Sequence, residues 1–175
     1  VFGLQGNIHH NLIEQLRERS CLRQAQNFYQ LQPPKSLDSY DFQIPNDFMD
    51  ISLEDACATL AYFSAKMMAE SLWQFTDYRA IEHCVLVGGG WQNPLIKKHF
   101  CELMASKHPH ALTFLSSEQL GCDAQALESQ LMAYLAIRHE EDLAITFPGT
   151  TGVQAALRGG ESELKQNRPK ADISR

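Results

Sequence analysis

The sequence lacks long apolar runs and any regular pattern of cysteines. No stretch approaches the roughly 20 apolar residues of a membrane-spanning helix, and the first residues lack the basic and apolar regions of a signal peptide. Its five cysteines are scattered and form no Cys-x-x-Cys pair. We therefore expect a cytoplasmic protein with no membrane segment, whose thiols pack as small apolar side chains.

Basic residues are also few. The chain has 15 Lys and Arg against 21 Asp and Glu, a formal net charge of −6 at pH 7. Contacts to nucleic-acid phosphates need clustered basic side chains, and the only basic tract is Arg168-Pro169-Lys170. A nucleic-acid partner is therefore not expected. That tract belongs to a polar tail, residues 159–175, which we expect to be flexible.

Several catalytic and metal-binding patterns are missing as well. The sequence has no Gly-x-Ser-x-Gly elbow and neither of the common glycine spacings of nucleotide-binding loops. The pairs His9-His10 and His108-Pro109-His110 lack the i, i+4 spacing of two ligands on one helix. We expect these histidines at the surface and predict no metal site.

The residues that are present favour a helical first half. With 44% hydrophobic residues, the 175-residue chain can bury a core. Apolar spacing predicts one or two short helices between residues 7 and 29, and a long helix over residues 53–75 behind a Ser52–Asp55 capping pattern. Prolines interrupt the segment between them, so residues 32–50 are predicted to form a long loop and a candidate site or partner surface.

The second half alternates between strand and helix signals. Residues 84–87 are short, apolar and followed by glycines, which indicates a fully buried strand of a parallel sheet. A helix follows, with Asn93 as its cap and Pro94 at its first position. Residues 111–115 predict a second strand, and Asp123 is placed to cap a last helix. This order predicts an α/β fold.

The stretch VLVGGGWQNP joins the first strand to its helix through Gly88, Gly89 and Gly90. Such a junction brings backbone N–H groups to the partially positive start of a helix, where phosphate or a ribose hydroxyl can approach without a Cβ in the way. A plain tight turn, with one glycine at positive φ and another allowing close helix–strand packing, explains the glycines equally well. Lys97 lies too far along the helix to act as the lysine of a phosphate loop.

Two further segments have both a functional and a structural interpretation. Glu128 lies at the edge of an apolar helix face, where its carboxylate either projects into a cleft or belongs to the helix surface. Residues 146–153, TFPGTTGV, combine hydroxyls with two glycines, which suits a polar ligand or an ordinary turn. The residues alone leave both alternatives open.

Five segments, taken in order, carry a more specific signal than any one of them. They are QPPKS (Gln32–Ser36), EDACATLAYFSA (Glu54–Ala65), VLVGGGWQNPL (Val85–Leu95), GCDAQALESQLMAYLA (Gly121–Ala136) and TFPGTTGV (Thr146–Val153). In letters and in spacing, the chain from about residue 28 to 153 resembles the C-terminal half of the anhydro-N-acetylmuramic acid kinases.

This resemblance implies a fold and an activity. The family belongs to the sugar kinase, Hsp70 and actin superfamily, so residues 1–158 would form an incomplete C-terminal lobe of an actin-like (RNase H-like) ATPase, helix-rich with a short parallel sheet. Members use ATP and Mg²⁺ to open the 1,6-anhydro ring of the cell-wall sugar and to phosphorylate O6 in peptidoglycan recycling. A sugar substrate and ATP are therefore the expected partners.

The resemblance also implies roles for particular residues. Gly88, Gly89 and Gly90 would form the turn on the adenosine side, with Asn93 capping the helix behind it. Glu128 stands where the family has a glutamate that looks into the sugar cleft. Lys35, in the proline-stiffened loop, is a further candidate for contact with the nucleotide.

Two departures from the family pattern qualify the expected activity. Residues 37–40 replace the usual Thr-Gly-Arg-Glu, and no segment matches the phosphate-binding Asp-Gly motif or the catalytic aspartate. We expect those groups upstream of residue 1, and therefore no kinase activity from these residues alone. Exposed apolar surface should then favour self-association, for example as a homodimer. The alternatives are a non-catalytic nucleotide-binding or protein-interaction module of the same fold, and another sugar kinase.

Overall fold

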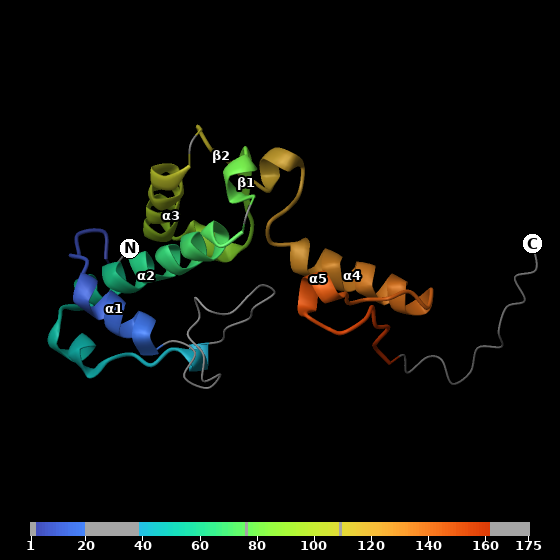
Figure 1. The fold of residues 1–175 in the computed structure, drawn as a ribbon, viewed down its shortest axis with the longest axis horizontal. Helices are drawn as coiled ribbons and strands as arrows, with labels where there is room; N and C mark the ends of the chain where they lie inside the picture. Colours follow the sequence, from blue (N-terminus) through green and yellow to red (C-terminus); the bar gives the residue numbers. More distant parts are fainter. Residues whose placement is uncertain (1–2, 20–38, 76, 109, 162–175) are drawn as a thin grey trace, which may run out of the picture. The chain divides into compact units, whose positions relative to one another are not determined.

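The computed structural model describes residues 3–19, 39–75, 77–108 and 110–161 (Figure 1). The chain divides into two compact units, residues 1–127 and 128–175. The first unit contains α1 (His10–Arg19), α2 (Leu53–Trp73), α3 (Pro94–Lys107) and the strands β1 (His83–Leu86) and β2 (Thr113–Ser116). Short 3₁₀ helices connect them: η3 (Ser39–Asp41), η4 (Asn46–Asp50), η5 (Tyr78–Ala80), η6 (Gly89–Gln92) and η7 (Glu118–Leu120).

The long predicted helix is confirmed as α2, which begins as its sequence predicts. The Ser52 side chain accepts a hydrogen bond from the Asp55 backbone N–H at 3.1 Å, which satisfies one of the free donors of the first turn. One face of α2 packs Phe63 and Met67 against α1, in a cluster completed by Leu12, Ile13, Leu16 and Phe48. Met67 is thus a core residue. A second helix between residues 20 and 29 would lie outside the described residues.

The opposite face of α2 carries small residues where it meets α3 and the sheet. Ala65 and Ala69 are fully buried in a cluster with Leu86, Phe100 and Met104. Strands β1 and β2 are parallel, with His83 paired to Thr113 and Leu86 to Ser116. The predicted α/β class is therefore confirmed: a short parallel sheet among several helices.

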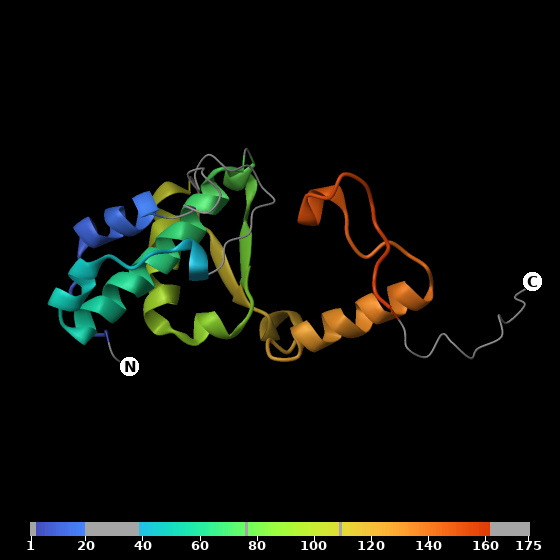
Figure 2. The ribbon, with the colours of Figure 1, turned by 90° about the horizontal axis from the view of Figure 1, so that it is seen from below.

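The prediction that the first strand is fully buried is wrong. Leu86 is buried, but Val85 is 38% exposed and Val87 45% exposed. Figure 2 gives the reason: α1, α2 and α3 all lie on one side of the two strands. Because side chains alternate across a strand, only every second residue of β1 reaches that helical layer. Within the described chain, the other face of the sheet keeps its valines accessible.

The segment ahead of α1 is anchored to the start of α2 by Asp55. The Asn7 backbone N–H donates to Asp55 Oδ1 at 2.7 Å, and His9 Nε2 lies 3.1 Å from Asp55 Oδ2. The bond from Asn7 and the contact with His9 lower the pKa of the Asp55 carboxyl. The His9 backbone N–H also donates to the buried Thr59 hydroxyl at 3.1 Å. His9 is therefore a structural contact, not the free surface residue that was expected.

The second unit contains α4 (Leu127–Glu140) and α5 (Pro148–Thr151), with an antiparallel bridge between Thr146 and Leu157. The helix predicted after Asp123 is confirmed, but Asp123 caps a turn ahead of it: its Oδ1 accepts from the Gln125 N–H at 2.8 Å, and α4 starts at Leu127. None of the described residues of this unit is buried. The exposed large apolar residues are Leu131, Met132, Tyr134, Ile137, Leu143, Phe147 and Leu157.

The division at residue 127 falls inside the lobe that was predicted to span residues 1–158. The predicted flexible tail, residues 159–175, lies largely outside the described residues. In the part of the chain that the structure describes, no helix combines the length and the apolar character needed to cross a membrane.

Candidate functional site

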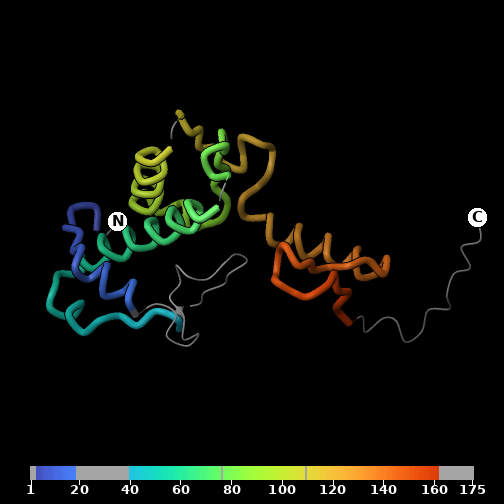
Figure 3. The backbone as a smooth tube through the Cα atoms, viewed as in Figure 1, coloured from blue at the N-terminus to red at the C-terminus, as the bar shows by residue number. Residues whose placement is uncertain are grey.

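The glycine turn connects the end of β1 to the start of α3 (Figure 3). Gly88 has φ 100° and ψ 162°, a conformation that side-chain-bearing residues rarely adopt. The next residues form η6, in which the Trp91 N–H donates to Gly88 O and the Asn93 N–H donates to Gly90 O. One of the three glycines is therefore required by the backbone, as the tight-turn interpretation predicts.

The backbone conformation of Gly89 and Gly90 does not require glycine. Neither has a positive φ, and a Cβ built on either residue would meet no atom within 4 Å. The close helix–strand packing that was considered for one of them is therefore not observed. The space in front of both glycines is open, and a ligand can approach their backbone where a side chain would otherwise stand.

Asn93 caps α3 as predicted. Its Oδ1 accepts hydrogen bonds from the backbone N–H groups of Leu95 at 3.0 Å and Ile96 at 3.4 Å, and Pro94 occupies the first helical position. This cap holds the positive end of the helix dipole directly behind the glycine turn.

An open cavity of about 340 Å³ lies beside the turn, at the carboxyl ends of both strands. Its apolar wall consists of Leu86, Trp91, Phe114 and Leu115, and its polar groups come from Gln92, Lys97, Ser116, Glu118 and Gln119. The Trp91 ring packs against the ring of Phe100, with centroids 4.9 Å apart. The carboxyl ends of parallel strands are where α/β proteins generally bind ligands.

The charged residues of this cavity have opposite signs. Backbone N–H groups, first of all its own, lower the pKa of the Glu118 carboxyl, so this side chain is ionised at neutral pH. Lys97 supplies a cation from the first turns of α3. The cavity thus offers a hydrogen-bond acceptor for hydroxyls at one place and a positive charge for an anion at another.

The structure brings only some of the predicted site residues together. Gly88 lines the cavity, Gly89 and Gly90 continue the same turn, and Asn93 caps the adjoining helix. Glu128 is exposed in the first turn of α4 and belongs to the second unit, so its role at the sugar stays a prediction. Lys35 lies outside the described residues.

The threonine hydroxyls of the TFPGTTGV segment form hydrogen bonds within the segment itself. The Thr150 and Thr151 hydroxyls donate to the Phe147 carbonyl at 3.1 and 3.4 Å, and Thr146 and Thr151 bond to each other. The interpretation of this segment as an ordinary turn therefore explains the geometry.

Sequence reasoning missed most of the cavity wall. Lys97 was excluded as a phosphate-loop lysine, yet it lines the same cavity as Gly88 because α3 starts at the turn. Ser116, Glu118 and Gln119 were not considered. Their position directly after the second predicted strand was the signal that could have found them, since parallel strands end at the same edge of a sheet.

The chain matches the family model described as anhydro-N-acetylmuramic acid kinase over residues 3–162. Among curated proteins of that name, it is 37% identical to the one from Caulobacter vibrioides over 134 residues, which is 76% of this chain and 33% of the relative. It is 35% identical to the Rhizobium rhizogenes protein over 162 residues, covering 91% of this chain and 39% of the relative.

The protein of that name from Zymomonas mobilis subsp. mobilis is 31% identical over 160 residues, 91% of this chain and 40% of the relative. The chain thus spans about a third to two fifths of the length of these relatives. The family match covers nearly the whole chain, and the segments on which the resemblance was based lie within it. The chain therefore belongs to the anhydro-N-acetylmuramic acid kinase family.

Proposed function

We propose that this chain forms the nucleotide-binding side of a cytoplasmic, ATP-dependent kinase that opens the 1,6-anhydro ring of anhydro-N-acetylmuramic acid and phosphorylates its O6 in peptidoglycan recycling. One observation carries the proposal: an open cavity at the carboxyl ends of two parallel strands, next to a glycine turn whose Gly89 and Gly90 face empty space. Family membership favours a kinase over the non-catalytic module of the same fold.

The residues of the cavity fit an adenosine nucleotide. Trp91 and Phe114 provide an apolar wall for the base, and the Glu118 carboxylate can accept hydrogen bonds from ribose hydroxyls. Gly89 and Gly90 let the ribose or phosphate approach the backbone, while Lys97 and the start of α3 favour the negative charge of the phosphates. ATP, when bound, supplies the phosphoryl group for transfer.

The rest of the reaction needs groups that these residues do not provide. Phosphoryl transfer needs a base that orients the nucleophile, and Mg²⁺ to neutralise the phosphates. Among the described residues, no cluster of three or more His, Cys, Asp or Glu could hold a metal ion. We therefore assign no step through Mg²⁺ to this chain, and Glu128 remains the proposed contact to the sugar.

The nucleotide site is tested by Gly89→Val, measured as ADP binding to the full chain by isothermal titration calorimetry. The added side chain projects into open space, so folding is preserved while the approach to the backbone is blocked. We expect about a tenfold or greater loss of affinity. Gly149→Val is the matched control, because its Cβ also meets no atom within 4 Å. Equal ADP affinity in all three proteins, or no saturable binding to the unmodified chain, would contradict the proposal.

The proposal also implies that the 175 residues alone do not turn over the anhydrosugar, since they span only about a third to two fifths of the length of the relatives that they match. Incubation of the purified chain with ATP, Mg²⁺ and anhydro-N-acetylmuramic acid checks this point. Formation of the 6-phosphate would show that the catalytic groups lie within these residues.

A further inference from the structure

A second cavity, of about 540 Å³, lies at the opposite ends of the two strands, where β1 and β2 begin. Four basic side chains line it. Arg79 belongs to η5, His83 is the first residue of β1, and His108 and His110 belong to the connection between α3 and β2. Along the chain, His108 and His110 have no other histidine close by. The parallel pairing of the strands supplies one, because His83 is paired to Thr113, close to both in the chain.

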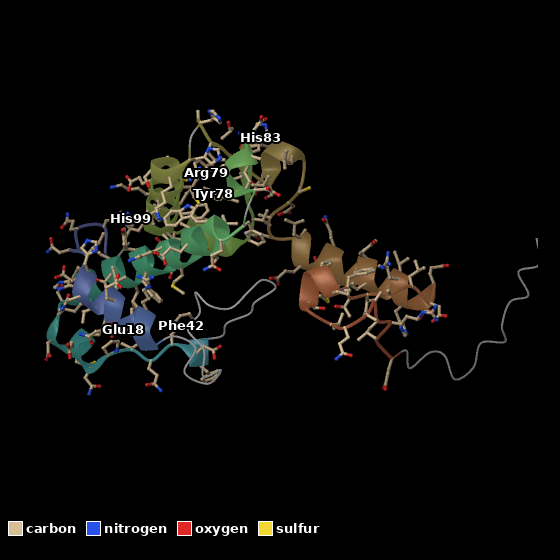
Figure 4. The ribbon with its side chains drawn as sticks, in the orientation of Figure 1. Glu18, Phe42, Tyr78, Arg79, His83 and His99 are labelled. Carbon is tan, nitrogen blue, oxygen red and sulfur yellow. The ribbon has the colours of Figure 1, made fainter. Side chains whose placement is uncertain are left out.

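Arg79 keeps most of its hydrogen-bonding capacity for a ligand. Its Nε donates to the Tyr78 hydroxyl at 3.3 Å, and it forms no ion pair with a carboxylate of the described residues. Figure 4 shows the side chains of Tyr78, Arg79 and His83 in the same part of the first unit, and Arg79 and His83 line the same cavity. The cavity is lined by one carboxylate, that of the exposed Glu82. A guanidinium has five donors in a planar fork, and four of them are left for an oxyanion.

His108 presents a nitrogen that lacks a partner. Its Nδ1 lies 2.9 Å from the His110 carbonyl oxygen and 3.4 Å from the His110 backbone nitrogen, and these contacts fix the orientation of the ring. The ring also packs edge-on against Tyr78, with centroids 6.5 Å apart. Its Nε2 is buried and has no hydrogen-bond partner among the described residues.

We propose that this cavity binds the phosphate group of a small phosphorylated molecule, with Arg79 as the anchor and His83 and His110 as further donors. The guanidinium and the two imidazoles supply donors for the three acceptor oxygens of a phosphate monoester. The cavity is larger than a phosphate group needs, and Ala80, Ile81 and Ala111 provide an apolar border for the rest of the molecule.

This site is separate from the proposed nucleotide site, since the two cavities lie at opposite ends of the strands and share no lining residue. A test must therefore distinguish them. The full chain is titrated with inorganic phosphate at constant ionic strength, with chloride as the replacing anion, and the histidine ring protons are followed by NMR.

We expect saturable shifts of the ring protons of His83, His108 and His110, and about a tenfold loss of phosphate affinity in Arg79→Gln. His83→Gln should weaken binding through a different element. Arg158→Gln, which alters an exposed arginine of the second unit, should bind phosphate normally.

Unchanged affinity in Arg79→Gln and His83→Gln would overturn the proposal, as would histidine shifts that chloride reproduces. If the chain fails to bind ADP but still binds phosphate, the proposed function is contradicted and the phosphate site at Arg79 is not.

Discussion

At the scale of single residues, glycine has three different roles in this chain. Gly88 is needed because its backbone has a positive φ. Gly6 is needed because a Cβ there would lie 2.1 Å from the Glu54 carbonyl oxygen, where the N-terminal segment crosses the start of α2. Gly89 and Gly90 meet neither condition, and the open space in front of them is available to the proposed nucleotide.

Gly6→Ala should destabilise the chain by about 2 kcal/mol or more, because a methyl group this close to a backbone carbonyl forces the segment away from α2 and from its bonds to Asp55. Urea denaturation followed by circular dichroism measures the change. Gly90→Ala is the control and should change stability by less than about 1 kcal/mol, since its Cβ enters open space. Equal stabilities for the two variants would show that the segment is not packed as described.

At the scale of elements, α3 links the fold to the candidate site. Its buried residues Leu95, Phe100 and Met104 pack against α2 and the sheet, while its first turn contributes Lys97 to the cavity. The Asn93 cap sets where the helix begins, and with it the position of the turn. Stability and ligand binding are therefore expected to depend on the same side chain.

Asn93→Ala should cost about 1 kcal/mol of unfolding free energy, because two N–H groups of the first turn lose their acceptor. ADP affinity should fall as well. Asn93→Asp keeps the acceptor oxygen and should keep most of the stability. Thermal unfolding and calorimetric titration of the three proteins check both effects. Full stability in Asn93→Ala would mean that the cap contributes nothing.

At the scale of the whole chain, exposed apolar surface stands out. Among the described residues, no helix covers the sheet face on which Val85 and Val87 are accessible, and α4 exposes Leu131 and Met132. Parallel sheets are normally covered on both faces, and the chain spans only about a third to two fifths of its relatives. These surfaces are therefore places where additional protein, or another copy of the chain, would pack.

We predict that the chain self-associates at high concentration, because association removes this apolar surface from water. Sedimentation velocity over a concentration series measures it. The double variant Leu131→Gln and Met132→Gln should associate less, with little effect on folding because both side chains are exposed. Met49→Gln, in η4, is the control for an exposed apolar residue elsewhere. A monomer at all concentrations would refute the prediction.

Local signals in the sequence determined much of the fold. Ser52 and Asn93 marked the starts of α2 and α3, and apolar spacing marked the helices, because caps and periodicity act within a few residues. The parallel pairing followed from the order of the elements. The glycine turn was recognised for the same reason: its strand, glycines and cap are consecutive in the chain.

The tertiary structure decided what depends on distant residues. It placed Glu118 beside Gly88 and His83 beside His108, pairs whose members belong to segments joined only through the sheet. It also showed that the Val85 side chain is 38% exposed, since the described helices α1, α2 and α3 cover only one side of the strands. Burial and cavity walls arise from packing between elements, and packing depends on how those elements meet in three dimensions and not on spacing along the chain.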